Sequence, residues 1–250
     1  MIEDSPTLKL HRNFTRPSQA DINVLRNTPT EFIVDCMDGR GSLHHAIKPI
    51  LPMDSSIVGI AVTCECGPAD NLGVLGALDV AQPGDIVVAS TDSFTQTAVI
   101  GDLVLGMMKN KGVIGFVTDG LVRDLEGIER LSLPVFCKGV TPNSPARNGP
   151  ASAGLPVNLD STHICSGDII IADRAGVVVV PLQQLNAISS KLQKVKNDEA
   201  ALQQAVETGL TLPPFIRKSL MLEKLSNLIS NFAIKDPAKK LLGKGSLFNP

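Results

Sequence analysis

The sequence predicts an α/β fold with a layered core. Short runs of valine and isoleucine recur between about residues 57 and 181, and they alternate with turns and with segments of helical apolar spacing. The strand-like runs are continuously apolar, which is typical of strands buried on both faces. A chain of 250 residues with 43% hydrophobic residues can bury such a core without disulfide staples. We therefore expect one large domain or two small ones, with helices packed on a sheet.

Several of the expected strands follow a turn, a helix stop or a glycine. The expected strands cover residues 57–64, 86–89, 113–118, 133–137, 169–172 and 177–180. The expected helices cover residues 30–47, 71–80, 102–109, 182–209 and 216–232, and glycines at 39 and 41 interrupt the first. Residues 1–27 are polar and irregular, so we expect an arm or a short helix that could pack on a neighbour. This gives three regions: an arm over 1–27, a catalytic domain over 28–181, and C-terminal helices and a tail over 182–250 that we expect to pack on a neighbouring subunit.

Two segments look alike, residues 83–89 and 166–172, and each combines Gly-Asp with a run of branched apolar residues. This similarity could mark an internal repeat. We favour the simpler interpretation that a turn followed by a buried strand has few sequence solutions.

Composition argues against several classes of protein. The formal net charge is −2 and there is no Trp or Tyr, so neither a nucleic acid nor an anionic membrane is an expected partner. No stretch of about 20 apolar residues exists, and we expect a cytoplasmic protein. The five cysteines have no regular spacing, which fits a reducing compartment. Cys64 and Cys66 could form a soft-metal or redox site, but we favour apolar packing on a strand.

The helix predicted over 182–209 carries a polar residue on its apolar stripe. Its apolar members are Leu185, Ile188, Leu192, Val195, Leu202 and Val206, and the missing member of the series is Glu199. Either this carboxylate reaches water at the edge of the stripe, or it faces a cation or a neighbouring subunit's site. Spacing alone leaves both alternatives open.

The most informative block for chemistry runs from Gly101 to Asp124. Twenty residues separate Asp102 from Arg123, and a helix followed by a strand returns the chain over about that distance. The helix start and the strand's carboxyl end then share one edge of the sheet, where open α/β sheets bind ligands.

The residue types in this block suit a small anionic substrate and a hard cation. The amides that open the helix attract anions, and the guanidinium of Arg123 can hold a carboxylate with two hydrogen bonds. The carboxylates of Asp102 and Asp124 are suitable ligands for Mg²⁺, directly or through water. The plainer alternatives are a surface ion pair and a simple helix N-cap.

At these residues the chain resembles the RraA-like family of class II pyruvate aldolases. Members cleave 4-hydroxy-4-methyl-2-oxoglutarate or 4-carboxy-4-hydroxy-2-oxoadipate, and many decarboxylate oxaloacetate. The resemblance covers roughly residues 28–225. It is carried by Gly101-Asp102-Leu103 and Asp119-Gly120-x-x-Arg123-Asp124, and its specific part is Asp102, a gap of twenty residues and Arg123-Asp124. The chain departs from the family pattern in two places, Asp173-Arg174-Ala175-Gly176 and Gly149-Pro150-Ala151-Ser152. These departures put the identity of the substrate in question.

The resemblance implies a layered, swivelling β/β/α-type core and a set of residue roles. Arg123 would bind the carboxylate and keto oxygen of pyruvate, with backbone amides near Gly101, Leu103 and Val104. Asp124 would ligate Mg²⁺ or Mn²⁺ directly, and Asp102 would act through water. Glu199 of an adjacent subunit would also act through water, in a homotrimer or homohexamer.

Other functions fit the sequence less well. The same family contains non-enzymatic regulators of ribonuclease activity, but that branch typically lacks an acid after the arginine, so Asp124 argues against it. A methyltransferase is not expected, because no strand leads into a Gly-x-Gly-x-Gly loop. A serine or cysteine hydrolase is not expected either, because His44, His45 and His163 belong to no nucleophile motif.

Overall fold

The structure, a computed structural model, describes residues 7–234, with side chains up to residue 230. Contacts within the chain divide it into a first unit that ends at Lys196 and a second that begins at Asn197, inside helix α6 (Leu185–Glu207). The candidate site, apart from Glu199, belongs to the first.

The first unit is built on one large sheet. In the described residues it has nine strands, in the order β1-β9-β3-β4-β6-β8-β2, with β12 paired to β3 and β13 paired to β12. Strands β3, β4, β6 and β8 run parallel to one another. The strands are β1 (Leu8–Leu10), β2 (Lys48–Pro49), β3 (Ile57–Glu65), β4 (Asp85–Ser90), β6 (Gly115–Thr118), β8 (Val135–Cys137), β9 (Ala151–Ala153), β12 (Ile169–Asp173) and β13 (Gly176–Val180).

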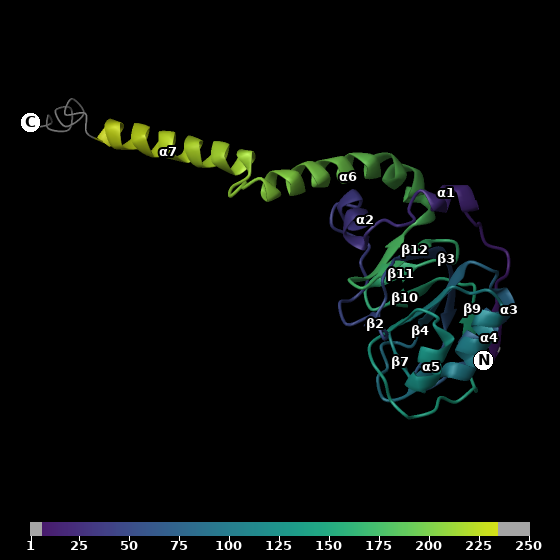
Figure 1. The fold of residues 1–250 in the computed structure, drawn as a ribbon. Coiled ribbons are helices and arrows are strands. Elements are labelled where there is room, and N and C mark those ends of the chain that lie inside the picture. The colour runs from purple at the N-terminus through teal and green to yellow at the C-terminus, as the bar shows by residue number, and fades with distance from the viewer. Residues whose placement is uncertain (1–6, 235–250) are drawn as a thin grey trace, which may run out of the picture. The chain divides into compact units, whose positions relative to one another are not determined.

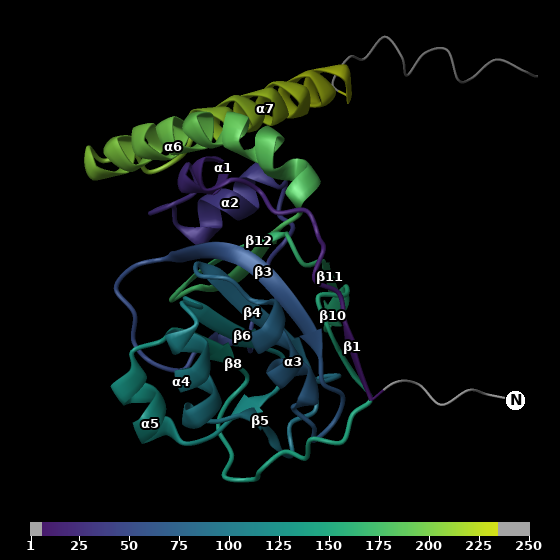
Figure 2. The ribbon, with the colours of Figure 1, turned by 90° about the vertical axis from the view of Figure 1, so that its right-hand side faces the viewer.

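The large sheet is covered on both faces. Helices α3 (Leu72–Val80), α4 (Asp102–Asn110) and α5 (Leu125–Leu131) lie together beside one face (Figures 1 and 2). The other face carries a hairpin of β10 (Val157–Leu159) and β11 (Thr162–Ile164).

Strand β4 shows how one strand serves both layers. All six of its residues are buried. Val87 packs in the cluster on the helical side, and Val88 packs in the cluster beneath the hairpin. This alternation follows from the period of two in a strand. The predicted layered α/β fold of the β/β/α type is confirmed, and its continuous apolar runs are strands buried on both faces.

A third apolar cluster joins the sheet to the N-terminal helices. Helix α1 (Gln19–Asn23), helix α2 (Thr30–Cys36) and the first half of α6 pack against β12 and β13. Strand β1 pairs in parallel with β9, and Leu25 is fully buried. The described part of the segment predicted as an arm is therefore built into the fold of its own chain, while residues 1–6 lie outside the described residues.

Helix α2 is shorter than the helix predicted over residues 30–47. It ends at Cys36, because Asp38 and Gly39 adopt positive φ angles of 56° and 81°. The amide of Gly39 then donates back to the carbonyl of Val34 at 3.0 Å, which closes the helix in a left-handed cap.

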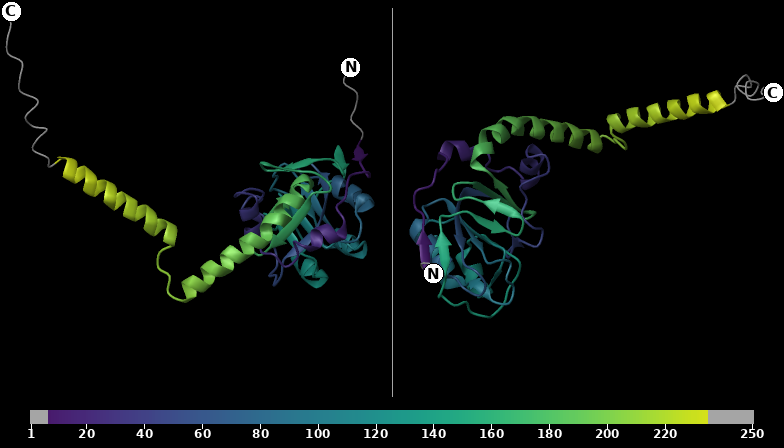
Figure 3. Two further views of the ribbon diagram at one scale, coloured as in Figure 1. Left: turned by 90° about the horizontal axis from the view of Figure 1, so that it is seen from above. Right: turned by 180° about the vertical axis from the view of Figure 1, so that it is seen from behind.

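The second unit holds the end of α6 and helix α7 (Pro214–Ile234), separated by a short non-helical segment (Figure 3). Both helices confirm predicted patterns. The α6 stripe is buried at Leu185, Ile188 and Leu192 but exposed at Leu202 and Val206. No helix among residues 7–234 is long and apolar enough to span a membrane. Residues 235–250, the last part of the region predicted as C-terminal helices and a tail, lie outside the described residues.

The two similar segments are two copies of one turn. In the first, the Asp85 carboxylate accepts from the amide of Gln82 at 2.7 Å, and in the second the Asp168 carboxylate accepts from the amide of Cys165 at 2.8 Å. The strands that follow, β4 and β12, flank β3 on opposite sides. This geometry agrees with the favoured interpretation, in which the same kind of turn before a buried strand is encoded by similar residues at both places.

The first of these turns contains a buried ion pair that yields a stability prediction. Arg16 donates two hydrogen bonds to Asp85, at 2.7 and 3.0 Å, and the Asp85 side chain is 2% exposed. Arg16→Ala leaves that carboxylate buried without its partner, so we expect urea unfolding to show a loss of about 3 kcal/mol. The matched control is Arg12→Ala, which breaks an exposed pair with Asp79 and should cost at most about 1 kcal/mol. Equal losses in the two variants would contradict this account.

Candidate active site at the start of α4

Two short strands bring the predicted site residues together. Strand β5 (Ala98–Ile100) pairs in parallel with β7 (Leu121–Val122), and the amide of Arg123 donates to the carbonyl of Ile100 at 3.0 Å. Gly101 and Arg123 directly follow these paired residues. The predicted meeting of the α4 N-terminus with the Arg123–Asp124 segment is therefore confirmed.

Only glycine fits at position 101, because neighbouring side chains fill the space that a Cβ atom would need. Its backbone is extended, with φ −128° and ψ −174°, which any residue can adopt. A methyl group at this position would overlap the Oδ2 atom of Asp124 and would lie 3.1 Å from both Cγ and Nε of Arg123. The Asp124 carboxylate and the Arg123 side chain thus lie directly against the backbone that opens α4.

Asp124 is held in an unusual backbone conformation. It is the N-cap of α5 with φ 62° and ψ 50°, in the left-handed region, and its side chain makes no capping hydrogen bond. Such a conformation costs about 1 kcal/mol or more in a residue other than glycine. It directs the carboxylate back toward Gly101 instead of onto its own helix, and leaves the side chain 41% exposed. This carboxylate is free of a capping role and accessible to a cation.

Arg123 lies between Asp124 and a loop that the sequence did not connect to it. Its Nε atom is 3.2 Å from Oδ2 of Asp124, but the approach is not that of a hydrogen bond, and the buried Nε–H has no acceptor. Its Nη1 donates to the hydroxyl of Ser144. The Arg123 side chain is 32% exposed, so the outer part of its guanidinium can still donate to an anionic ligand.

Asp102 is half-buried in the first turn of α4 and packs on α5. Its carboxylate occupies the space that a side chain at position 127 would need, because a methyl group on Gly127 would overlap Oδ2 of Asp102. Sequence reasoning missed both Gly127 and Ser144. Only the packing of α4 on α5, and of the loop after residue 140 on Arg123, reveals them.

The substrate-binding residues predicted on α4 differ in exposure. Leu103 is 74% exposed, and Val104 is half-buried. The first intrahelical hydrogen bond runs from the amide of Leu105 to the carbonyl of Gly101 at 3.2 Å. The amides of Leu103 and Val104 therefore precede the helical ladder and are available to a ligand.

The donor set fits a divalent cation that keeps most of its water. No group of three or more His, Cys, Asp or Glu side chains in residues 7–234 is arranged to hold a metal. Mg²⁺ commonly uses only one or two protein carboxylates, and Asp124 and Asp102 provide two on adjoining segments. Glu199 is exposed and belongs to the second unit, so nothing within one chain assigns it to this site.

The close contact at Gly101 gives a prediction for activity. Gly101→Ala should displace the Asp124 carboxylate and the Arg123 side chain and so lower any kcat/KM of this site by about 10²-fold. Gly106→Ala is the control on the same helix, since a methyl group there meets only Leu131, at 3.7 Å. Circular dichroism should show both variants folded. Activity of Gly101→Ala equal to that of Gly106→Ala would show that the contact has no role.

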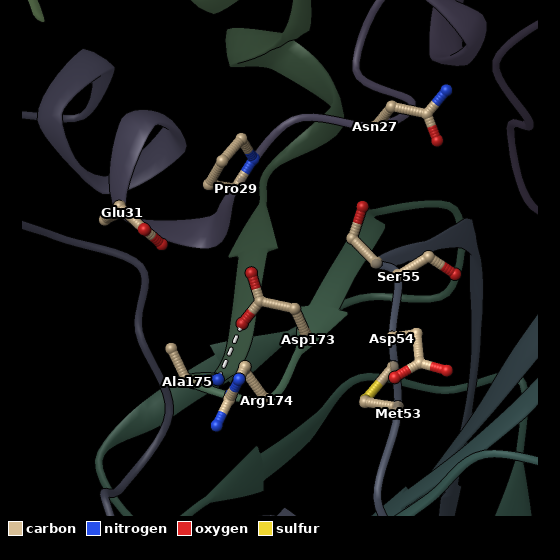
Figure 4. Close-up of a pocket in the computed structure, with 10 residues that line it drawn as sticks. Asn27, Pro29, Glu31, Met53, Asp54, Ser55, Asp173, Arg174 and Ala175 are labelled. Carbon is tan, nitrogen blue, oxygen red and sulfur yellow. Dashed lines mark hydrogen bonds between the residues drawn. The ribbon is translucent and has the colours of Figure 1, made fainter.

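Another concave region lies away from these residues, around the turn between β12 and β13 (Figure 4). It encloses about 380 Å³ beside Glu31, Asp54 and Asp173. The Asp173 carboxylate accepts from the amide and hydroxyl of Thr30, at 2.8 and 2.9 Å, and from the amide of Ala175 at 2.8 Å. Asp173 therefore caps α2, and its three hydrogen bonds give it a structural role.

Comparison with known proteins places this arrangement in a family. The RraA-like family, described as Aldolase/RraA, matches residues 30–179. The chain belongs to the RraA-like family. A relative from Halalkalibacterium halodurans, with the provisional name 4-hydroxy-4-methyl-2-oxoglutarate aldolase, is 36% identical over 196 residues. The match covers 77% of this RraA-like chain and 93% of the relative.

Solved structures confirm the fold. An uncharacterised protein from Pseudomonas syringae matches this RraA-like chain with a TM-score of 0.69 and 24% identity, over 79% of this chain and 97% of the other. RraAS2 from Streptomyces coelicolor, described as an unusual member of the RNase ES inhibitor RraA protein family, has a TM-score of 0.68 and 24% identity. That match covers 76% of this chain and 99% of the other.

Proposed function

We propose that this protein is a divalent-metal-dependent carbon–carbon lyase. Its substrate would be a 4-hydroxy-2-oxo diacid such as 4-hydroxy-4-methyl-2-oxoglutarate, its product pyruvate, and oxaloacetate decarboxylation a side activity. The observation that carries the proposal is the meeting of Arg123, Asp124 and Asp102 at the opening of α4. The relative with the aldolase name supports the same reaction class.

Arg123 and the first amides of α4 would bind the 2-oxo acid. The planar guanidinium matches a carboxylate and an adjoining keto oxygen, and the Arg123 side chain is 32% exposed. The amides of Leu103 and Val104 would donate to the same group at the positive end of the helix. Exposed Leu103 would form part of the rim of the site.

Asp124 would hold Mg²⁺ or Mn²⁺ directly, and Asp102 would hold it through water. When bound, the cation polarises the keto group and stabilises negative charge that develops on it. Arg123 adds a second positive group on the same oxygen. In cleavage, the proton of the substrate hydroxyl would pass to a water molecule held by the Asp102 carboxylate, and the carbon that carried the hydroxyl would become a carbonyl. The bond between this carbon and the carbon next to the keto group would break. Its electron pair would stay with the keto fragment, which leaves as the enolate of pyruvate.

A neighbouring subunit would complete the site with Glu199. This carboxylate is exposed, and the apolar stripe around it is also exposed at Leu202 and Val206. A homotrimer or homohexamer would cover this half of α6 and place Glu199 near a second chain's cation, acting through water. Size-exclusion chromatography with light scattering tests the assembly, and a monomer would remove Glu199 from the proposal.

The reaction is tested by pyruvate release from a panel of 2-oxo acids that includes 4-hydroxy-4-methyl-2-oxoglutarate and oxaloacetate. A coupled dehydrogenase assay detects the product. We expect activity with Mg²⁺ or Mn²⁺, loss of activity with a chelator, and recovery when the cation is restored. A protein that is inert on the whole panel and instead inhibits a ribonuclease would favour the regulatory role found in the same family.

A further inference from the structure

The structure brings a thiol, an imidazole and an amide together at the β10–β11 hairpin, with the thiol on the residue directly after β11. Asn158 and His163 are directly paired in the hairpin register, so their side chains share one face. The Oδ1 atom of Asn158 lies 3.0 Å from Nδ1 of His163, and Nε2 of His163 lies 3.6 Å from Sγ of Cys165. No sequence motif connects these residues, and the structure thus supplies the nucleophile that the sequence did not assign to His163.

The orientation of the imidazole suits a base. Oδ1 of Asn158 accepts a hydrogen bond, so the tautomer it stabilises carries its proton on Nδ1. The lone pair of Nε2 then faces the Cys165 thiol. This is the arrangement of nucleophile, base and orienting group that activates a weak nucleophile.

Cys165 is also held in place and accessible. Its backbone amide donates to the Asp168 carboxylate at 2.8 Å, and that carboxylate also accepts from the amide of Leu182 at 3.0 Å. The other four cysteines, Cys36, Cys64, Cys66 and Cys137, are buried, whereas Cys165 is half-buried. All five cysteines of the chain are free thiols. A reagent in solution therefore meets Cys165 first.

There is room for a small molecule beside the imidazole. A cavity of about 400 Å³ is bordered by Thr162 and His163 on the hairpin and by Pro181 and Gln184 at the start of the C-terminal helices. The cavity is a separate observation from the contacts among Asn158, His163 and Cys165. A small molecule in this cavity contacts the imidazole; Cys165 does not border the cavity, and its own partial exposure makes the thiol accessible.

We propose that Cys165 is a site of covalent modification by small, soft carbon electrophiles, with His163 as its general base and Asn158 as the positioning residue. In the reaction with iodoacetamide, the sulfur–carbon bond forms, the carbon–iodine bond breaks, and iodide leaves with the electron pair. The thiol proton passes to Nε2 of His163 and then to water. The proposal is independent of the lyase reaction.

The base is needed because the thiol is not acidic by itself. Partial burial raises the pKa of Cys165, and the nearby Asp168 carboxylate raises it further. The thiolate fraction at neutral pH is therefore small, and rapid reaction depends on proton transfer to a neighbouring group.

The test is the alkylation rate of the intact, full-length protein with iodoacetamide, followed by mass spectrometry of its peptides. We expect one fast adduct, on Cys165, formed faster than the adduct of free glutathione under the same conditions. His163→Gln should lower this rate by about tenfold or more. Asn158→Ala should give an intermediate rate, because the base remains but is no longer oriented. His45→Gln, which changes another exposed histidine, should have no effect.

Protection of the four buried cysteines in the same spectra reports whether each variant is folded. If His163→Gln fails this check, Asn158→Ala decides the question alone. Alkylation of Cys165 no faster than glutathione overturns the proposal. So does a folded His163→Gln or Asn158→Ala variant that reacts at the rate of the unchanged protein.

Discussion

Replacing Arg123 with lysine is expected to lower kcat/KM for pyruvate release by about 10²–10³-fold, the range seen when one donor to a developing negative charge is removed. The positive charge is kept, but the geometry is lost. The guanidinium reaches Ser144 through Nη1 while its Nε faces the Asp124 carboxylate. An ammonium group cannot fill both positions and also hold a carboxylate with two parallel hydrogen bonds.

The matched control is Arg130→Lys, which alters an exposed arginine in the last turn of α5. It should retain full activity. Steady-state kinetics with both variants, at saturating cation, separate the contribution of Arg123 geometry from that of total charge. Full activity of Arg123→Lys would mean that the arginine serves only as a surface cation and does not bind the substrate.

Replacing Asp124 with alanine is expected to reduce metal-dependent activity by about 10³-fold or more, since a bound cation contributes several kcal/mol of charge stabilisation. A second readout does not depend on catalysis. Mn²⁺ should raise the Tm of the unchanged protein by mass action, and this shift should disappear in Asp124→Ala.

Glu126→Gln is the control for this variant, because it removes one exposed carboxylate from the first turn of the same helix. It should keep both the activity and the Mn²⁺-dependent rise in Tm. A normal rise in Tm in Asp124→Ala would place the cation elsewhere, whatever the activity of that variant.

Longer elements with clear periodicity could be predicted from the sequence. Strand β3, helix α3 and helix α4 lie within one or two residues of their predicted bounds. Strands β5 and β7 could not be predicted, because two or three residues show no period. They nevertheless determine how Gly101 and Arg123 meet. The sequence thus predicted that the two segments converge, but not the pairing that joins them.

Some site residues could be predicted from the sequence, and others are recognised only in the structure. Asp102, Arg123 and Asp124 are polar residues at the ends of predicted elements, where ligand groups are expected. Gly127 and Ser144 become relevant only through packing, since one leaves space for the Asp102 carboxylate and the other receives a hydrogen bond from Arg123. Glu199 stands out in the sequence because it breaks an apolar stripe, and its proposed role depends on a second chain.

The proposed arrangement at the start of α4 is tested most directly by a crystal structure with Mn²⁺ and oxalate, a stable analogue of the pyruvate enolate. The anomalous signal of Mn²⁺ identifies the cation without ambiguity. The account predicts Mn²⁺ coordinated by a carboxylate oxygen of Asp124, with oxalate hydrogen-bonded to Arg123 and to the amides of Leu103 and Val104. A cation bound away from Asp124, or oxalate bound away from the start of α4, would contradict it.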